Sequence, residues 1–316
     1  MHLNTRPLWR NGPIGVPLGV GTWAWGDRGY WGYGTSYTEA DVTEAYAASR
    51  AAGLSLFDTA EAYGRGTSET LLGGMIREEL RRDGSAEIQV ATKFSPFPWR
   101  AGRSGPLRRA LAASLDRLGQ PRVGLYQLHF PLPVVSGRAW LRDLATAQRE
   151  GLVGAVGVSN YGPRDLRAAH QILADQGVAL ATNQVEYNLL HRKPERSGLV
   201  ELCAELGVTI IAYSPLAQGL LTGKYTPAHR PPGIRGLRYR RRRLAALAPL
   251  IERLTAIGAE HGGRTPGQVA LNWLIARGTL PIPGAKTAEQ ARHNAGGAGW
   301  SLSPTEVAEL SALGGR

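Results

Sequence analysis

The chain has 316 residues, of which 43% are hydrophobic and 20% are charged, so it can bury a large core and is not a disordered or fibrous protein. Its net charge of +12 favours anionic ligands, but no basic stripe interleaved with aromatic residues and no nucleic-acid-binding motif accompanies that charge. We therefore predict no nucleic-acid partner.

The sole cysteine, Cys203, excludes an internal disulfide and a zinc site built from cysteines, and it indicates a reducing compartment. The first residues contain no apolar segment of a secretory signal, and no run of about 18 apolar residues is present to span a membrane. We expect a cytoplasmic protein with no membrane partner. The sequence carries no signal for a particular oligomeric state.

The chain begins with a predicted hairpin at residues 8–17, because Asn11-Gly12 is a dipeptide typical of a tight turn. Short apolar runs then alternate with longer stretches of helical periodicity, several of which end in glycine, the usual helix stop. The apolar runs, predicted as strands, are 18–22, 54–58, 87–93, 123–129, 153–160, 179–185, 208–214 and 279–284.

Eight apolar strands that alternate with helices are typical of a parallel sheet covered by helices, and eight units over about 290 residues favour a (β/α)8 TIM barrel over an open doubly wound sheet. No linker divides the chain, so we predict a single barrel domain over 1–316. We also expect an insertion at 214–240 after the seventh strand and a C-terminal helix from about 303 to 313. The helices between strands are predicted at 38–53, 68–84, 106–121, 138–151, 163–177, 196–207 and 265–278.

Residues 19–24 read G-x-G-x-x-A, close to a dinucleotide-binding fingerprint. The following residues are not helical, so the strand–turn–helix context is absent and we reject a Rossmann fold. The aromatic residues of this segment follow the first strand at the barrel mouth, where we predict Trp23, Trp25 and Trp31 as walls of a substrate pocket. Simple loop packing is the alternative.

The densest basic cluster, RYRRRR at 238–243, opens an amphipathic stretch at 244–258. A solvated start of a helix is the favoured interpretation, and contact with an anion is the alternative.

Polar residues end the strands at the edge where a TIM barrel carries its active site. Asp58 ends the second strand with Tyr63 five residues later, Lys93 ends the third, and His129 ends the fourth. Tyrosine is a poor acid at neutral pH, but a nearby lysine lowers its pKa, and Asp58 can hold that lysine charged. His129 can orient a carbonyl oxygen. These residues predict proton transfer to a carbonyl oxygen while a hydride arrives from a cofactor.

The competing enzyme class is a TIM-barrel hydrolase, which would pair Asp58 with Glu61 or Glu69 across the mouth. Such an enzyme has no role for Lys93 or for the amides that end the fifth and sixth strands. No H-E-x-x-H or comparable ligand spacing occurs, so we predict no metal.

The motifs FDTAEAYG, ATKF, YQLH, GVSNY, NQVEYNLL, AYSPLAQGLLTGKY and PIPGAKTAEQARHN, in this order, resemble the aldo-keto reductase superfamily over about residues 8–313. GTWAWGDRGYWGYG is most similar to the pyridoxal reductase-like branch. The resemblance implies a catalytic tetrad of Asp58, Tyr63, Lys93 and His129, a small carbonyl substrate such as pyridoxal, and NADPH/NADP+ as cofactor. Phe130 stands where relatives commonly carry tryptophan, which changes one wall of the implied substrate pocket and leaves the identity of the substrate more open.

The resemblance also implies which residues hold the cofactor. Lys286 suits a 2′-phosphate, with Arg235 or the basic cluster as the alternative anchor. A nonenzymatic NADP(H)-sensing or partner-binding subunit, as some relatives are, would keep the same residues. The implied positions are Ser159, Asn160 and Gln184 for the carboxamide, Tyr213 for the nicotinamide ring, Ser214, Pro215, Leu216, Gln218, Gly219 and Lys224 for the pyrophosphate, and Gly284, Lys286, Gln290 and Asn294 for the adenosine end.

Overall fold

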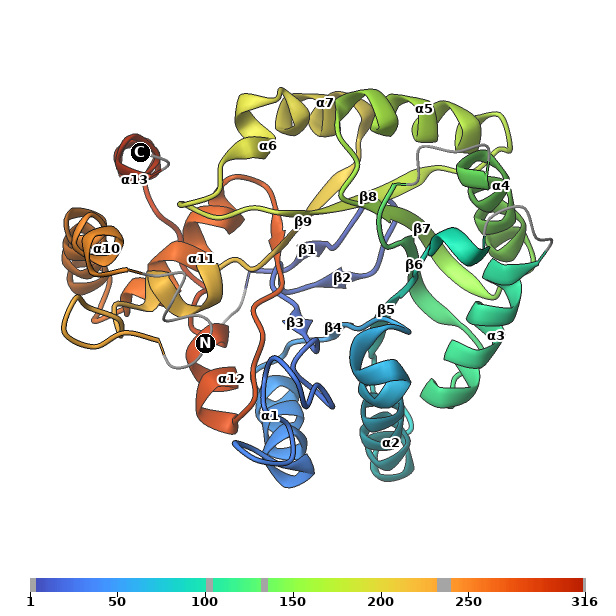
Figure 1. Cartoon of the computed structure of the whole chain (residues 1–316), viewed down its shortest axis with the longest axis horizontal. Coiled ribbons are helices and arrows are strands. Elements are labelled where there is room, and N and C mark those ends of the chain that lie inside the picture. The colour runs from blue at the N-terminus through green and yellow to red at the C-terminus, as the bar shows by residue number, and fades with distance from the viewer. Residues whose placement is uncertain (1–3, 101–104, 132–135, 232–239, 315–316) are drawn as a thin grey trace.

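The computed structural model of the chain describes residues 4–100, 105–131, 136–231 and 240–314. Its centre is a sheet of eight parallel strands in the order β10-β9-β8-β7-β6-β5-β4-β3 (Figure 1). Gly21 donates its N–H to the carbonyl of Pro283 and bridges Gly284, which joins the first strand to the last and closes the predicted (β/α)8 barrel. The strands are β3 Val20–Gly21, β4 Leu56–Asp58, β5 Gln89–Phe94, β6 Val123–Leu128, β7 Val153–Ser159, β8 Leu180–Glu186, β9 Thr209–Tyr213 and β10 Leu280–Pro281.

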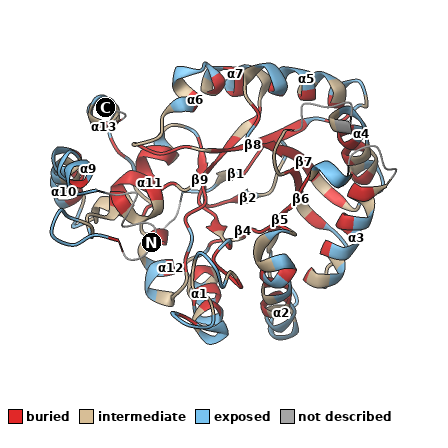
Figure 2. Cartoon of the chain, in the orientation of Figure 1, coloured by how far each residue is buried: buried red, intermediate tan, exposed pale blue. Residues whose placement is uncertain are grey.

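The helices surround the strands and turn their buried faces toward them (Figure 2). Each predicted helix is present, within a few residues of its expected bounds. The region predicted as one helix at 196–207 begins instead after Gly198, whose positive φ of 70° separates two short helices. The helices of the eight units are α1 Glu39–Ala51, α2 Thr67–Arg82, α3 Pro106–Leu118, α4 Ser136–Arg149, α5 Pro163–Ala174, α6 Lys193–Arg196, α7 Leu199–Leu206, α11 Pro266–Ala276 and α12 Ala288–Ala295.

A hairpin is present at the N-terminus, but its strands β1 (Arg6–Pro7) and β2 (Ile14–Gly15) begin before the predicted residue 8. A six-residue loop joins them in place of the predicted tight Asn-Gly turn, and within it Asn11 has a positive φ of 56° and Gly12 does not. Leu8 and Trp9 in its loop are buried against side chains inside the barrel, among them Leu56. Leu56 begins its strand. The hairpin therefore covers the amino-terminal end of the barrel and leaves the opposite end for a site.

The insertion after β9 contains the short helix η3 (Ala217–Thr222), and residues 232–239 of it lie outside the described residues. Of the basic cluster, the described Arg240–Arg243 are exposed at the start of α9 (Arg241–Ala245), which continues into α10 (Ala248–Glu260). The predicted C-terminal helix is α13 (Pro304–Leu313). Within the described ranges, no helix is long and apolar enough to cross a membrane.

Candidate active site

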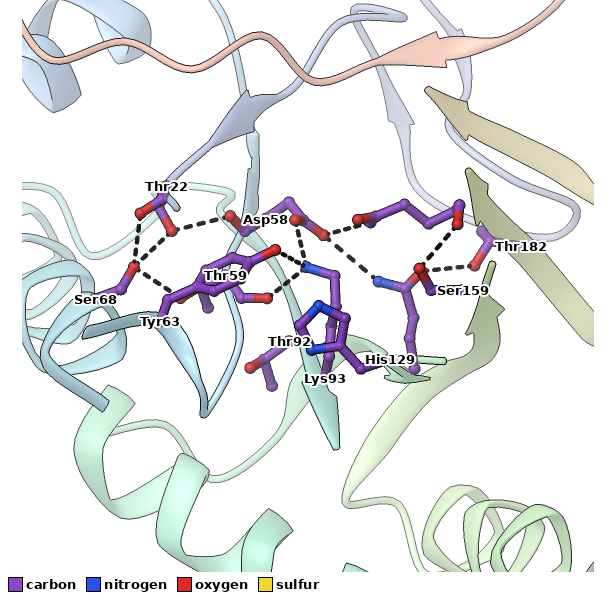
Figure 3. Close-up of polar contacts among 12 residues, drawn as sticks. Thr22, Asp58, Thr59, Tyr63, Ser68, Thr92, Lys93, His129, Ser159 and Thr182 are labelled. Atoms are coloured by element: carbon purple, nitrogen blue, oxygen red, sulfur yellow. Dashed lines mark hydrogen bonds and ion pairs between the residues drawn. The ribbon is translucent and has the colours of Figure 1, made fainter. Parts of the chain in front are cut away.

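Asp58 and Lys93 form a buried ion pair at the carboxyl ends of β4 and β5 (Figure 3). Lys93 Nζ donates to Asp58 Oδ1 at 2.5 Å and to the carbonyl of Thr59 at 2.8 Å. The exposed fraction is 0% for Lys93 and 2% for Asp58. Burial opposes the charge on Lys93, but attraction to Asp58 and Tyr63 outweighs burial, so the pKa of Lys93 is raised. The predicted pairing of the two strand ends is present.

The hydroxyl groups of three buried residues form a cluster beside Asp58 at the end of β4 (Figure 3). Thr22 Oγ1 donates to the carbonyl of Asp58 at 2.9 Å and lies 2.7 Å from Ser68 Oγ. Thr59 Oγ1 donates to the same serine at 3.0 Å. Satisfied buried polar networks are rigid, so these bonds hold the backbone of Asp58 and Thr59 in place.

Tyr63 opens the short helix η1 (Tyr63–Gly66) and brings its hydroxyl to 3.3 Å from Lys93 Nζ, which donates to it. Gly64 follows with φ of 55°, and a Cβ there would lie 2.8 Å from the carbonyl oxygen of Gly26, so only glycine fits this turn. Burial raises the pKa of the Tyr63 phenol, and the neighbouring Lys93 opposes that rise. The expected net lowering of this pKa by Lys93 is therefore wrong for the protein alone, because desolvation is the larger effect.

His129 directly follows β6, and its ring lies edge-on to the ring of Tyr63 with a centroid distance of 5.7 Å. The backbone N–H of His129 donates to the carbonyl of Phe94 at 2.9 Å, and Asn160 Nδ2 donates to the backbone carbonyl of His129 at 3.2 Å. Burial and the charge of Lys93 lower the pKa of the imidazole to about 3. The imidazole of His129 is therefore uncharged at neutral pH. It can orient a ligand through a hydrogen bond, but it carries no second proton to release.

The second oxygen of Asp58 is held by amides from the interior of the barrel. Gln184 Nε2 donates to Asp58 Oδ2 at 2.7 Å, and Gln127 Nε2 reaches the same oxygen at 3.5 Å. Thr182 Oγ1 donates to Gln127 Oε1 at 3.4 Å. Gln184, the implied ligand of the carboxamide, thus has its amide nitrogen on the carboxylate of Asp58. Sequence reasoning missed Gln127, although it shares the inward face of β6 with Leu125 and His129 by the two-residue period of a strand.

The residues at the ends of β7 and β9 contact one another beside His129. Ser159 Oγ donates to the carbonyl of Gln184 at 2.8 Å and accepts from Asn160 Nδ2 at 3.0 Å. Tyr213 Oη donates to Asn160 Oδ1 at 3.0 Å. Asn160 has a positive φ of 63°, a conformation that costs energy in a residue other than glycine and is common at functional sites. The structure brings these four predicted residues together.

The loop after β9 holds an unusual run of left-handed backbone: Ser214 (φ 49°), Ala217 (48°), Gln218 (55°) and Gly219 (94°). Turns of this kind gather backbone N–H groups into a concavity that suits anions. Gln218 Oε1 accepts a hydrogen bond from Tyr30 Oη at 2.9 Å, which ties this loop to the loop after β3. Tyr30 was not among the predicted site residues. The neighbouring Pro215 is buried, Leu216 is half-buried, and Lys224 is exposed with Nζ 4.9 Å from the ring of Tyr225.

The predicted adenosine-end residues lie at the turn between β10 and α12. Asn294 Nδ2 donates to the carbonyl of Gly284 at 3.1 Å, and Gln290 Oε1 accepts from the backbone N–H of Lys286 at 2.9 Å. Lys286 Nζ lies over the ring of Tyr37, 4.6 Å from its centroid. The alternative anchor Arg235 lies outside the described residues.

Aromatic side chains from the loop after β3 stand above the site. Trp23 is 40% exposed, stacks on Tyr30 at a centroid distance of 5.4 Å, and lies 5.5 Å from Trp31 and 6.4 Å from Tyr63. The prediction for Trp25 is wrong. Its ring is fully buried, because its indole N–H donates to the carbonyl of Ala285 at 2.7 Å and thereby turns the ring into the core.

A second aromatic group follows β5. Phe130 contacts Phe97 at a centroid distance of 6.1 Å, and Phe97 stacks on Trp99 at 4.5 Å. Trp99 is 67% exposed. Sequence reasoning missed Phe97 and Trp99, because a loop has no periodicity that tells which way its side chains turn.

Glu61 and Glu69, the possible partners of Asp58 in the hydrolase alternative, are both engaged in hydrogen bonds that stabilise the fold. Glu61 accepts hydrogen bonds from Arg100 Nη1 at 2.5 Å and from the backbone N–H of Ser95 at 2.7 Å. Glu69 is fully buried and accepts from Thr92 Oγ1 at 2.5 Å and from Arg117 Nε at 2.8 Å. Both carboxylates stabilise the fold around the site, and a general base facing the mouth needs a free oxygen.

Comparison with known proteins gives a consistent result. The model of the Aldo/keto reductase family matches residues 17–314. A chloroplastic pyridoxal reductase of Arabidopsis thaliana is 42% identical over 309 residues, which are 95% of this chain and 83% of the relative. An uncharacterized oxidoreductase of Mycobacterium tuberculosis is 39% identical over 293 residues, 90% of this chain and 85% of the relative.

Solved structures agree with the fold. A thermostable aldo-keto reductase in complex with the inhibitor epalrestat has a TM-score of 0.78 and 30% identity, covering 99% of this chain and all of that one. An aldo-keto reductase from Klebsiella pneumoniae in complex with NADPH has a TM-score of 0.75 and 28% identity, covering 99% of this chain and 95% of that one.

Proposed function

We propose that this chain, which belongs to the aldo/keto reductase family, reduces the carbonyl group of an aldehyde or ketone to an alcohol with NADPH. The observation that carries the proposal is the position of Lys93 Nζ, which contacts both the Asp58 carboxylate at 2.5 Å and the Tyr63 hydroxyl at 3.3 Å. Burial raises the pKa of the Tyr63 phenol, and the fixed ammonium of Lys93 opposes that rise and stabilises the phenolate that proton transfer leaves.

Each residue of the relay has one task. Tyr63 gives its hydroxyl proton to the carbonyl oxygen of the substrate, and Lys93 stabilises the phenolate that remains. Asp58 keeps Lys93 charged and in place. His129, neutral because its pKa is about 3, offers a hydrogen bond that orients the carbonyl oxygen. The bound NADPH supplies the hydride to the carbonyl carbon.

The residues around the mouth fit this cofactor. We assign the loop at 214–219, in which Ser214, Ala217, Gln218 and Gly219 have positive φ, to the pyrophosphate. We assign Tyr213, whose hydroxyl donates to Asn160, to the nicotinamide ring. We assign Lys286, at the turn before α12, to the extra phosphate that distinguishes NADPH from NADH, because its ammonium suits a phosphate.

A planar aromatic aldehyde, with pyridoxal as the first example to test, suits the entrance best. Trp23 stacks on Tyr30 there and is still 40% exposed, and a flat ring gains dispersion energy against such an aromatic surface. The similarity to a relative named pyridoxal reductase supports the same choice. We place the protein in the cytoplasm, because its sole cysteine, Cys203, is buried and suits a reducing compartment.

The test is a panel of aldehydes and ketones, including pyridoxal, followed by the loss of NADPH absorbance with the purified protein. We expect turnover with several carbonyl compounds and the highest kcat/KM for aromatic aldehydes. Tight NADPH binding without turnover of any of them would favour the nonenzymatic alternative. Absence of both NADPH binding and turnover would overturn the proposal.

A further inference from the structure

We propose that Ser95 is a positioning residue that fixes the tautomer of His129, so that the imidazole carries its proton on Nε2 and offers it to the substrate. The inference rests on the proposed carbonyl reduction for its catalytic meaning, but the tautomer itself is a property of the protein alone.

The contact that suggests this role is made at the ends of two neighbouring strands. Ser95 follows β5 and His129 follows β6, and Ser95 Oγ lies 3.3 Å from His129 Nδ1. Ser95 is fully buried. Among the described residues, His129 Nδ1 is the sole hydrogen-bond partner of this hydroxyl group, and Nε2 of the same ring has none.

Hydrogen-bond accounting then selects the direction of the bond. If Nδ1 donated to Ser95, the hydroxyl hydrogen of that buried serine would have no acceptor among the described residues, at a cost typical of an unsatisfied buried donor. If Ser95 Oγ donates instead, the hydroxyl donor is satisfied and Nδ1 is the acceptor. A neutral imidazole has one proton, so that proton is then on Nε2.

The neutrality of His129 makes the tautomer matter. Burial and the ammonium of Lys93 hold its pKa near 3, so the doubly protonated ring, which could donate from either nitrogen, is not populated at neutral pH. A ring with its proton on Nδ1 would present a lone pair to the lone pairs of a carbonyl oxygen. Ser95 removes that unproductive form.

Ser95 is itself held firmly. Its N–H donates to Glu61 Oε1 at 2.7 Å, and its carbonyl accepts from Arg100 Nη1 at 3.1 Å. Arg100 also pairs with Glu61 at 2.5 Å. The Glu61–Arg100 ion pair therefore fixes the backbone of Ser95, which directs the serine hydroxyl toward His129. This role differs from the one that the hydrolase alternative gave to Glu61.

The experiment is nitrogen NMR of the cofactor-free full chain with 15N-labelled histidine, with the His129 resonances assigned by their loss in His129→Asn. We expect a protonated Nε2 and an acceptor-type Nδ1 in the wild type. In Ser95→Ala the Nδ1 resonance should shift as its hydrogen bond is lost, and the form protonated on Nδ1 should gain population. Ser95→Thr, which keeps the hydroxyl group, should restore the wild-type pattern.

Kinetics give a second readout. Ser95→Ala should lower kcat roughly two- to tenfold, the effect of losing one neutral hydrogen bond, while the Kd for NADPH stays near that of the wild type. The matched control is Ser114→Ala, which removes another fully buried serine hydroxyl, on α3, whose hydrogen-bond partner is Arg117. This control should change neither the His129 resonances nor kcat.

Two results would overturn the inference: a wild type protonated on Nδ1, or a Ser95→Ala protein whose His129 resonances match those of the wild type. The first result is decisive even if Ser95→Ala does not fold. A wild type that is protonated on Nε2 and responds to Ser95→Ala, yet reduces no carbonyl compound, would refute the proposed function and support the role of Ser95 in fixing the tautomer.

Discussion

The floor and the rim of this site are built in different ways. The floor consists of Asp58, Lys93 and Gln184 on the strands, all at most 2% exposed and joined by hydrogen bonds of 2.5 to 2.7 Å. The rim consists of Trp23 and Trp99 on loops, which are 40% and 67% exposed and are held by ring stacking.

Under the proposed function, the floor carries out the chemistry and the rim selects the substrate. Groups that move a proton need fixed distances, and the paired register of parallel strands supplies them. Groups that select a substrate need only a surface of suitable shape, which loops can vary without disturbing the barrel. Substitutions on the floor should therefore abolish turnover, whereas those on the rim should change which substrates are preferred.

Lys93→Met should have the largest effect, because it breaks both the relay and a buried ion pair. Turnover should collapse, and the free energy of unfolding should fall by about 3–5 kcal/mol, since Asp58 is left buried without its counter-charge. Urea unfolding and the rate of NADPH oxidation measure the two effects. The matched double variant Asp58→Asn with Lys93→Met should recover stability without recovering turnover. A change confined to the Kd for NADPH would make Lys93 a cofactor ligand instead.

Tyr63→Phe tests the proposed proton donor beside the floor, since it removes only the hydroxyl group 3.3 Å from Lys93. The expected loss is on the order of 10²-fold or more in kcat, the scale of general acid catalysis. The Kd for NADPH and the free energy of unfolding should stay near those of the wild type. Stopped-flow and steady-state kinetics with one good substrate give the answer, and turnover close to that of the wild type would remove Tyr63 from the role of proton donor.

Lys286→Ala tests the turn between β10 and α12, which belongs neither to the floor nor to the rim. A charge-assisted hydrogen bond to a phosphate contributes about 1.5–3 kcal/mol, which is roughly ten- to a hundredfold in affinity. The variant should bind NADPH more weakly by that factor and NADH almost as before, and the wild-type preference for NADPH should decrease with added salt. Equal losses for both cofactors, or none, would show that Lys286 serves the packing against Tyr37 instead.

The sequence predicted the floor better than the rim for a physical reason. Asp58, Lys93 and His129 stand where apolar runs end, and the carboxyl ends of parallel strands meet at one edge of the barrel. Their meeting could therefore be inferred before any contact was known. The rise in the pKa of Tyr63 could not be inferred from the sequence, because desolvation depends on the side chains that cover the ring.

The rim shows the opposite case. Trp23 and Trp25 are two residues apart on one loop, yet one is exposed and the other is buried because the carbonyl of Ala285, far along the chain, accepts its indole N–H. Phe97 and Trp99 were missed for the same reason. Ser95 was missed because its partner lies on another strand end, and a serine at such a position carries no chemical signal until His129 is placed beside it.

Trp23→Ala should have the smallest effect and the most selective one. Aromatic pairs contribute about 0.5–1.5 kcal/mol beyond buried area, so the KM for aromatic aldehydes should rise roughly two- to tenfold, with kcat nearly unchanged. The KM for a short aliphatic aldehyde should not move, because such a substrate has no ring to stack on this surface. Trp23→Phe, which keeps an aromatic face, should lie between the variant and the wild type. A loss that is equal for aromatic and aliphatic substrates, or a loss in kcat alone, would mean that Trp23 supports Tyr63, 6.4 Å away, and would move it from the rim to the floor.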